Sequence, residues 1–269
     1  MTGEGDSRAA PALRRGLAVL SFLGTRAAPV SAGAIARELG LPRSSTYELL
    51  TELAAAGFAV HLPEQRRWGL GVTAFELGSA YLRGDPLERV GRPVLGRLAV
   101  QSGATAHLGV LHGAQTLYLA KEKPVAIGPT LVTEVGVRLP AALTATGLSI
   151  LAQLPAEQVR AQFADRTAFV GRTGRGPATL PALRRDLTAV RQRGWAVEDG
   201  RVSPDTASVA AAVFDHNGVP LAAVGVTVGH RCPSGGQAEC GHDFADLAGL
   251  VRGSARQVTA AIGGRQPTG

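Results

Sequence analysis

The chain has 269 residues, of which 45% are hydrophobic, and its formal net charge is +7. This length and apolar content are sufficient for two folded cores, one small and one of ordinary domain size. The sequence has no apolar run of about 18 residues, and its first residues lack the basic-then-apolar order of a signal peptide, so we expect a cytoplasmic protein with no membrane partner. Its two cysteines are too few for a disulfide scaffold in a chain of this size.

The chain opens with signals for a tail and two short helices. Residues 1–11 are small and polar and are predicted to form a disordered tail. A first helix is expected to begin near Leu13. A second is expected to begin at Ser31, whose hydroxyl can cap it, and to end at Gly40, which can take the left-handed conformation.

A third helix and a hairpin are predicted to follow after a tight turn. Pro42 is best tolerated in the first turn of a helix, so this helix is expected to run from there to near Gly57. Strands are predicted over residues 59–62 and 68–70, with a basic turn between them. The order of helix, turn, helix and hairpin indicates a winged helix-turn-helix over residues 12–71, a module that binds double-stranded DNA.

Helical spacing turns one side of the third helix outward, where it can enter a DNA groove. The first turn of that helix carries donors that suit phosphates and base edges, and the arginines of the hairpin turn suit the flanking backbone. The candidate DNA contacts are Arg14, Arg15, Ser31, Arg43, Ser44, Ser45, Tyr47, Glu48, Arg66 and Arg67. Residues 1–72 hold eight arginines and six acidic residues, so they account for only +2 of the net charge. The prediction of DNA binding therefore depends on where the cations lie and not on how many there are. The alternative is a small helical domain with ordinary capping serines and solvated arginines.

The rest of the chain predicts a linker and an α+β domain. A helix over residues 72–84 is expected to bridge to a second domain over residues 85–264. The elements expected there are a helix at 87–102, a hairpin of 104–111 and 115–122, a strand at 130–135, a loop at 136–142, helices at 144–154 and 180–193, strands at 195–198, 208–214 and 219–228, and a helix at 243–262. Hairpins with helices grouped between them predict an antiparallel sheet covered on one side.

Several segments resemble the IclR-type bacterial transcription regulators. LPRSSTYELLTELAAAGF resembles the recognition helix of that family and WGLG its wing-closing strand. TAFELGSAYL, GVRLPAALTATGLSILAQLP, RGWAVEDGRVSPDTASVAAAVFD and GVPLAAVGVTV resemble the linker and ligand-binding half, in the same order over residues 12–262. The resemblance implies a GAF-like effector-binding domain and a repressor that senses a small organic acid or aromatic metabolite. We expect it to bind a palindromic operator as a homodimer or a dimer of dimers.

The resemblance also assigns the effector site position by position. The residues at the family's pocket positions are Leu139, Ala142, Leu143, Thr146, Asp199, Ser208, Gly225 and Thr227. This chain departs from the family where Ala142 replaces a frequent histidine and Gly225 removes a hydroxyl, which favours a larger and more apolar effector. Glu48 replaces a common arginine in the recognition helix, so a different operator sequence is expected. The alternative is that the pocket positions only pack a core.

One further set of residues has the types that bind zinc. His230, Cys232, Cys240 and His242 form an H-x-C and C-x-H pair, but the spacing is not that of a standard zinc site, and an ordinary loop is favoured. The sequence has no G-x-S-x-G, Walker loop or H-E-x-x-H motif, so neither an enzyme nor a cofactor is expected. A zinc-dependent hydrolase and a protein-interaction scaffold remain the alternative functions.

Overall fold

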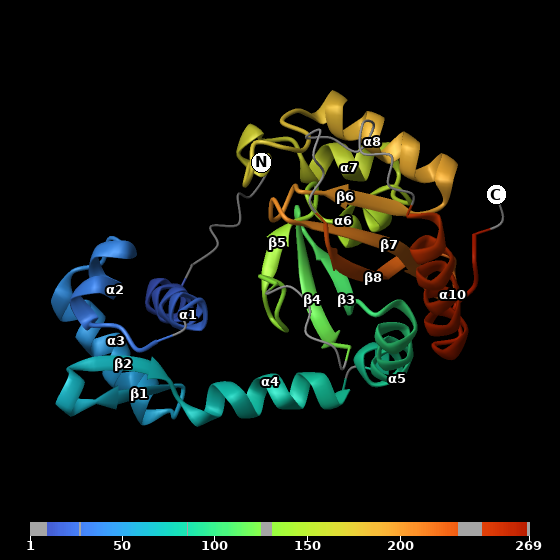
Figure 1. The fold of residues 1–269 in the computed structure, drawn as a ribbon. Helices are drawn as coiled ribbons and strands as arrows, with labels where there is room; N and C mark the ends of the chain where they lie inside the picture. Colours follow the sequence, from blue (N-terminus) through green and yellow to red (C-terminus); the bar gives the residue numbers. More distant parts are fainter. Residues whose placement is uncertain (1–9, 27, 85, 125–130, 231–243, 268–269) are drawn as a thin grey trace, which may run out of the picture. The chain divides into compact units, whose positions relative to one another are not determined.

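The computed structural model describes residues 10–26, 28–84, 86–124, 131–230 and 244–267. The chain divides into two compact units, Met1–Gly84 and Asp85–Gly269 (Figure 1). Nearly all of the tail expected at residues 1–11 lies outside the described residues, and the first helix already begins at Pro11. Among the described residues, no helix combines the length and the apolar character needed to cross a membrane.

Unit 1 has the elements expected of it. They are α1 (Pro11–Gly24), α2 (Ala32–Glu38), α3 (Arg43–Ala55), β1 (Ala59–Leu62), the 3-10 turn η1 (Pro63–Gln65), β2 (Arg67–Leu70) and α4 (Val72–Gly84). The Ser31 hydroxyl caps α2 by accepting from the amide of Ala34 at 3.2 Å, and Gly40 has a φ of +62°. The unit closes around a core in which Ile35, Leu50 and Trp68 are buried.

Unit 2 is built on one antiparallel sheet. Its elements are α5 (Pro86–Ser102), β3 (Thr105–His112), β4 (Gln115–Glu122), β5 (Arg138–Pro140), α6 (Ala145–Leu151), α7 (Ala156–Gln162), η2 (Arg166–Ala168), α8 (Leu180–Arg193), β6 (Ala196–Asp199), β7 (Thr206–Phe214), β8 (Pro220–Gly229) and α10 (Ala245–Ala261). The strand order is β5-β4-β3-β8-β7-β6. The α+β class expected for this region is confirmed.

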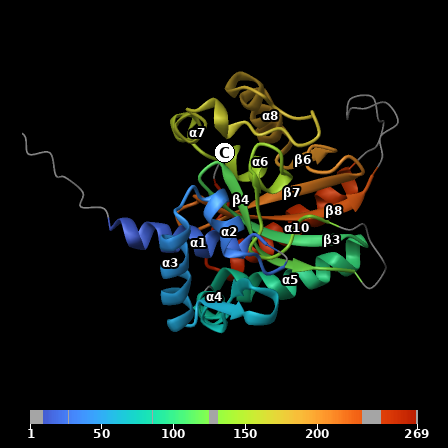
Figure 2. The same ribbon diagram turned by 90° about the vertical axis from the view of Figure 1, so that its left-hand side faces the viewer.

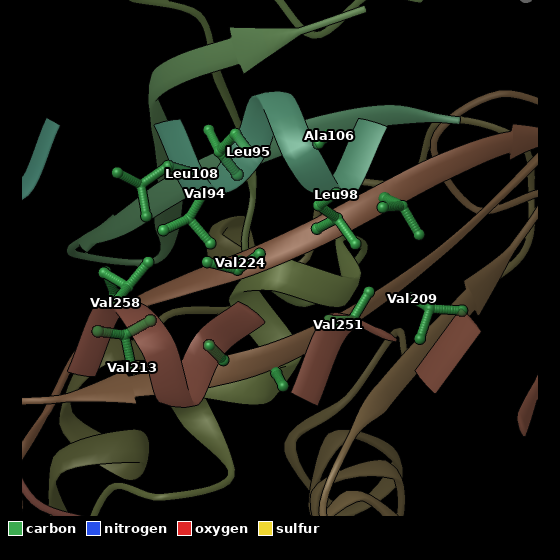
Figure 3. Close-up of a cluster of buried hydrophobic side chains, with 14 of the residues drawn as sticks. Val94, Leu95, Leu98, Ala106, Leu108, Val209, Val213, Val224, Val251 and Val258 are labelled. Carbon is green, nitrogen blue, oxygen red and sulfur yellow. The ribbon is translucent and has the colours of Figure 1, made fainter. Parts of the chain in front are cut away.

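The prediction that this sheet is covered on one side is wrong. One face packs against α5 and α10 through side chains that include Leu98, Val224 and Val251 (Figure 3). The other face packs against α6 and α8, as the ribbon in Figure 2 shows. The physical reason lies in β7 and β8, whose buried residues occupy consecutive positions instead of alternating ones. Strands buried on both faces have this pattern.

The prediction of a strand at residues 130–135 is also wrong for the part that the structure describes. Residues 131–135 do not belong to a strand. Gly136 has a φ of +82°, and its amide donates to the carbonyl of Tyr118 in the middle of β4, so the chain joins the sheet edge only from this residue onward. The strand comes later, at β5, within the segment expected to be a loop. The sequence also gave no expectation of α7, a short helix whose inward side consists of little more than Val159.

Candidate functional site

The structure places the expected face of α3 at the surface of unit 1. Thr46 and Leu50 are buried on its inner side. Arg43, Ser44, Tyr47 and Glu48 are exposed, and Ser45 is half-buried. Tyr47 keeps 54% of its surface exposed. The exposed side of α3 therefore offers polar and aromatic groups together.

The start of α3 is open. Its N-cap residue is Pro42, and no side chain caps the helix. The first-turn amides of a helix have no partner within the helix and carry a partial positive charge, so they favour an anion such as a DNA phosphate. Arg43 stands at this end, with its Nη2 atom 3.9 Å from the position that a Cβ on Gly33 of α2 would occupy. The α2–turn–α3 geometry thus presents an amide cluster beside a guanidinium group.

The wing carries one strained residue. Arg66, between the 3-10 turn and β2, has a φ of +50°, the left-handed region that glycine tolerates best. Backbone strain of this kind persists where the surrounding structure enforces it, and it clusters at functional sites. Arg67 instead donates to the carbonyl of Pro29 at 3.3 Å, which ties the wing to the body of the unit. Arg66 is therefore the better placed of the two arginines to reach a DNA backbone.

The remaining candidates in unit 1 differ in availability. Arg14 and Arg15 are exposed on α1. The hydroxyl oxygen of Ser31 accepts the bond that caps α2, and its proton stays available to donate to a phosphate. Ser31 can therefore donate to DNA only from the position that this cap fixes.

Unit 2 contains a narrow cavity on the face of the sheet that packs against α6. Its volume is about 20 Å³, which is room for about one water molecule. The lining residues are Tyr118, Leu131, Val132, Thr133, Thr144, Glu198, Val202, Ser203, Thr206, Ser208 and Thr227. A smaller void of about 10 Å³ shares Tyr118, Ser208 and Thr227 and adds His107, Ala145, Thr146, Val209, Ala210, Gly225 and Val226. We call the two together the ligand cavity.

Strand register assembles the polar part of the ligand cavity. Glu198 of β6 pairs with Ser208 of β7, which pairs with Thr227 of β8, so the three side chains share one face of the sheet. The Ser208 hydroxyl lies 2.7 Å from Glu198 Oε1, to which it donates, and 3.0 Å from Thr227 Oγ1. The amide of Arg201 donates to Glu198 Oε2 at 3.1 Å. The buried hydroxyl oxygen of Thr133 has no partner among the described residues, so it is available to a ligand.

Burial alters the protonation of two groups in the ligand cavity. Loss of hydration raises the pKa of Glu198 from its ordinary 4.5 to about 7, although the bonds from Ser208 and the Arg201 amide oppose the rise. Loss of hydration, aided by the charge of Lys121, lowers the pKa of His107 to about 3. The cavity therefore holds a neutral imidazole and a carboxyl group that changes charge near neutral pH.

Four of the eight residues predicted for the effector site line the ligand cavity, namely Thr146, Ser208, Gly225 and Thr227. The others do not line it: Leu139, Ala142 and Leu143 are buried in packing. Asp199 follows Glu198 in the strand and so faces the opposite side of the sheet, where its Oδ2 is 3.5 Å from Nε2 of His230. The assignment of Asp199 to this site is corrected to Glu198.

Sequence reasoning missed Tyr118, Thr133 and Glu198. Glu198 could have been found by pairing the expected strands in register with Ser208, since a shift of one residue exchanges the faces. Tyr118 and Thr133 come from a strand and a turn that the carried-over segments do not include. Nothing local in the sequence marks either of them.

Cys232, Cys240 and His242 lie outside the described residues, so the structure does not report on that loop. Within the described part of the chain, no group of three or more His, Cys, Asp or Glu side chains forms a potential metal site.

The raised pKa of Glu198 makes stability depend on pH. The folded protein holds this proton more tightly than the unfolded chain, so the group's stabilising contribution is fully present below pH 4.5 and is lost as the pH rises through about 7. Between pH 4.5 and about 7, we expect titration of Glu198 to lower the free energy of unfolding of the unsubstituted protein by about 3 kcal/mol. The Glu198→Gln protein should lack this decrease. Urea unfolding at both pH values measures this. Glu157→Gln on exposed α7 is the control, and a Glu198→Gln protein that follows the unsubstituted pH dependence contradicts the expectation.

Each of the two units matches a domain of known proteins. Residues 12–63 match the family model described as the IclR helix-turn-helix domain, and residues 79–262 match the bacterial transcriptional regulator IclR C-terminal domain. The HTH-type transcriptional repressor AllR of Klebsiella pneumoniae is 29% identical over 260 residues, which is 95% of this chain and 91% of that protein. The transcriptional repressor IclR of Escherichia coli is 28% identical over 254 residues, 94% of this chain and 90% of that protein.

Solved structures show the same fold. An IclR regulator from Alicyclobacillus acidocaldarius has a TM-score of 0.78 at 22% identity, covering 95% of this chain and 100% of that one. An IclR homologue from Microbacterium hydrocarbonoxydans, solved with 4-hydroxybenzoate, has a TM-score of 0.76 at 21% identity, covering 93% of this chain and 98% of that one. The relatives are regulators and not enzymes, which agrees with the expectation that the chain has no catalytic site. This chain belongs to the IclR family of DNA-binding bacterial transcription regulators.

Proposed function

We propose that the protein is a cytoplasmic repressor that binds a palindromic operator as a homodimer, or as a dimer of dimers, and responds to a small ligand in unit 2. In this proposal residues 12–71 bind the DNA, residues 72–84 connect the two domains, and residues 85–264 bind the ligand. The observation that carries the proposal is the open start of α3, where free amides lie beside Arg43 and an exposed polar face.

Exposed apolar residues support a dimer. Of the fourteen large hydrophobic side chains that are strongly exposed among the described residues, eight lie in unit 1. Leu13 and Leu17 lie one turn apart on α1, and Val72 and Phe75 are similarly close on α4. Neighbouring exposed apolar side chains of this kind mark contact surfaces, and burying those of α1 and α4 against a second copy would stabilise a dimer. Two reading heads would also double the number of base pairs contacted.

The lining of the ligand cavity supports an aromatic or hydroxylated effector over a simple organic acid. Hydroxyl groups provide most of the polar atoms, and the acidic Glu198 lies among them. No arginine or lysine is found among the residues that line the cavity in the described part of the chain. A ligand carboxylate would therefore meet a carboxyl group and no cation, which costs free energy in a buried site. Because the cavity is so small, a ligand also requires some of the side chains that line it to move.

The DNA interface is tested by comparing two arginines. We expect Arg43→Ala to weaken specific operator binding by about 1–3 kcal/mol, because a guanidinium at the start of α3 can read a base. Arg66→Ala is expected to weaken binding to all sequences alike and to lower the salt dependence, because the wing contacts the backbone. Gel-shift titrations on operator and non-operator DNA at several fixed salt concentrations separate the two effects.

Arg37→Ala, at an exposed site near the end of α2, is the matched control and should bind nearly as well as the unsubstituted protein. Unchanged binding of both the Arg43 and Arg66 variants would remove α3 and the wing from the interface.

A further inference from the structure

Unit 2 has a second cleft that shares no residue with the ligand cavity. Its volume is about 240 Å³, against about 20 Å³ for the larger void of the ligand cavity. The lining residues are Gln153, Arg191, Gly194, Ala211, Ala212, Phe214, Arg252, Ala255, Arg256, Gln266 and Pro267. We call it the arginine cleft. It is open and large enough for a small solute without rearrangement.

The sheet itself creates the arginine cleft. β6 is short and pairs with β7 only over Ala207–Ala210, so Ala211–Phe214 continue past the end of their neighbour. Helices α8 and α10 flank this stretch, which has no strand partner on its β6 side, and the segment after α10 contributes Gln266. The result is a recess whose floor is strand and whose walls carry long cationic side chains.

Three guanidinium groups line the arginine cleft and no acidic side chain does. Arg191 is held in place, because its Nη1 donates to the carbonyl of Ala152 at 3.0 Å and its Nη2 to the hydroxyl of Thr188 at 3.3 Å. The Arg252 guanidinium lies about 4.0 Å from the position that a Cβ on Gly194 would occupy. Neither Arg252 nor Arg256 has an ion pair or a side-chain hydrogen bond among the described residues.

Nearby helix ends offset only part of this charge. α6 and α8 have their C-caps at Ala152 and Gly194, and each helix C-terminus contributes roughly half a negative charge. Against three guanidinium groups this leaves an excess of roughly two positive charges in one recess. Each guanidinium also has unused N–H groups in the planar arrangement that matches a phosphate or carboxylate.

We propose that the arginine cleft is a second small-molecule site, which binds a compact multivalent anion of the phosphate or polycarboxylate type. Arg252 and Arg256 are one turn apart on α10 and bind from one wall, while Arg191 binds from α8 opposite. The glutamine amides donate to the oxygens that remain. An anion bound here is chemically distinct from the effector of the ligand cavity, since that cavity presents Glu198.

The test is isothermal titration of the full-length protein with inorganic pyrophosphate and, separately, citrate, at constant ionic strength maintained with sodium chloride. We expect saturable binding of one anion per chain. The double variant Arg252→Ala/Arg256→Ala is expected to bind at least tenfold more weakly, because it lacks two of the three charged donors. The double variant Arg184→Ala/Arg185→Ala makes the same change of charge on the exposed side of α8 and should bind as the unsubstituted protein does.

Arg252→Lys/Arg256→Lys keeps the charges and should retain binding at reduced affinity, which separates a lost site from a damaged fold. A stronger response to pyrophosphate than to citrate identifies phosphate as the preferred group, and the reverse identifies carboxylate. Equal and weak binding by all the variants means an adventitious ion only and overturns the proposal. A melting temperature that falls in the Arg252→Ala/Arg256→Ala protein while pyrophosphate binding is unchanged also overturns it, because the arginines then only stabilise helix ends.

Discussion

Replacing Phe75 by aspartate is expected to dissociate the protein into monomers and to weaken operator binding by about a hundredfold or more. Phe75 is 73% exposed on α4, on the same side as Val72, which is 65% exposed. Burying a phenylalanine against a partner stabilises an interface by about 1.5–3 kcal/mol, and an isologous interface contains the residue twice. An aspartate there removes both contributions and adds two carboxylates that must lose water. Each reading head then binds its half-site alone.

Sedimentation velocity and gel-shift titration on the same samples measure the two effects together. Val100→Asp is the matched control, because Val100 is 72% exposed on a helix of unit 2 and the substitution has the same character. The control should keep the mass and the operator affinity of the unsubstituted protein. A Phe75→Asp protein that also keeps both would show that α4 does not form the proposed dimer contact.

Replacing Ser208 by tryptophan is expected to abolish the response to the effector while operator binding without ligand stays intact. Ser208 borders both voids of the ligand cavity, and an indole is far larger than the space available there. A ligand shifts the DNA-binding equilibrium only if it binds the DNA-competent and DNA-incompetent arrangements of the protein with unequal affinity. A protein whose cavity is filled cannot bind the ligand, so its operator affinity should not change when the ligand is added. The effector for this test is the compound that most raises the melting temperature in a metabolite screen. Operator affinity is then measured with and without it.

Two further variants keep this test decisive if the indole disturbs the sheet. Ser208→Ala removes the bond to Glu198 without filling the cavity, and Thr227→Val removes the other hydroxyl at nearly constant volume. Both variants should bind the effector more weakly while their operator affinity without ligand stays unchanged. If Ser208→Trp still responds normally, the ligand lies elsewhere. If the alanine and valine variants both lose operator binding without ligand, these residues only pack the core.

The sequence predicts unit 1 well because its signals are local. A capping hydroxyl at Ser31, the left-handed turn at Gly40 and the proline before α3 each act within a few residues, and the structure contains all three. The outward face of α3 follows from helical periodicity alone. The strain at Arg66 was not predicted, because no local rule places arginine in the left-handed region.

Unit 2 was predicted less well because its decisive features depend on pairing between distant segments. The class of fold follows from the hairpins. Which face Glu198 occupies depends on its register against β7, and the family resemblance that assigned Asp199 to the pocket does not include that register. The sequence did not predict the second helical layer. The consecutive small residues of β7 are compatible with a strand buried on one face as well as with one buried on both faces. The arginine cleft joins side chains about 60 residues apart in the chain, so spacing could not reveal it.

The two outer strands of the six-stranded sheet have a consequence for behaviour at high concentration. β5 has three residues and ends in Pro140, which has no amide hydrogen to donate, and β6 has four residues. An unpaired strand edge is a template on which another chain can add its own strand, and short edges interrupted by proline are poor templates. Copies of this protein are therefore expected to meet through side chains and to resist the sheet-to-sheet growth that leads to fibrils, even in long storage.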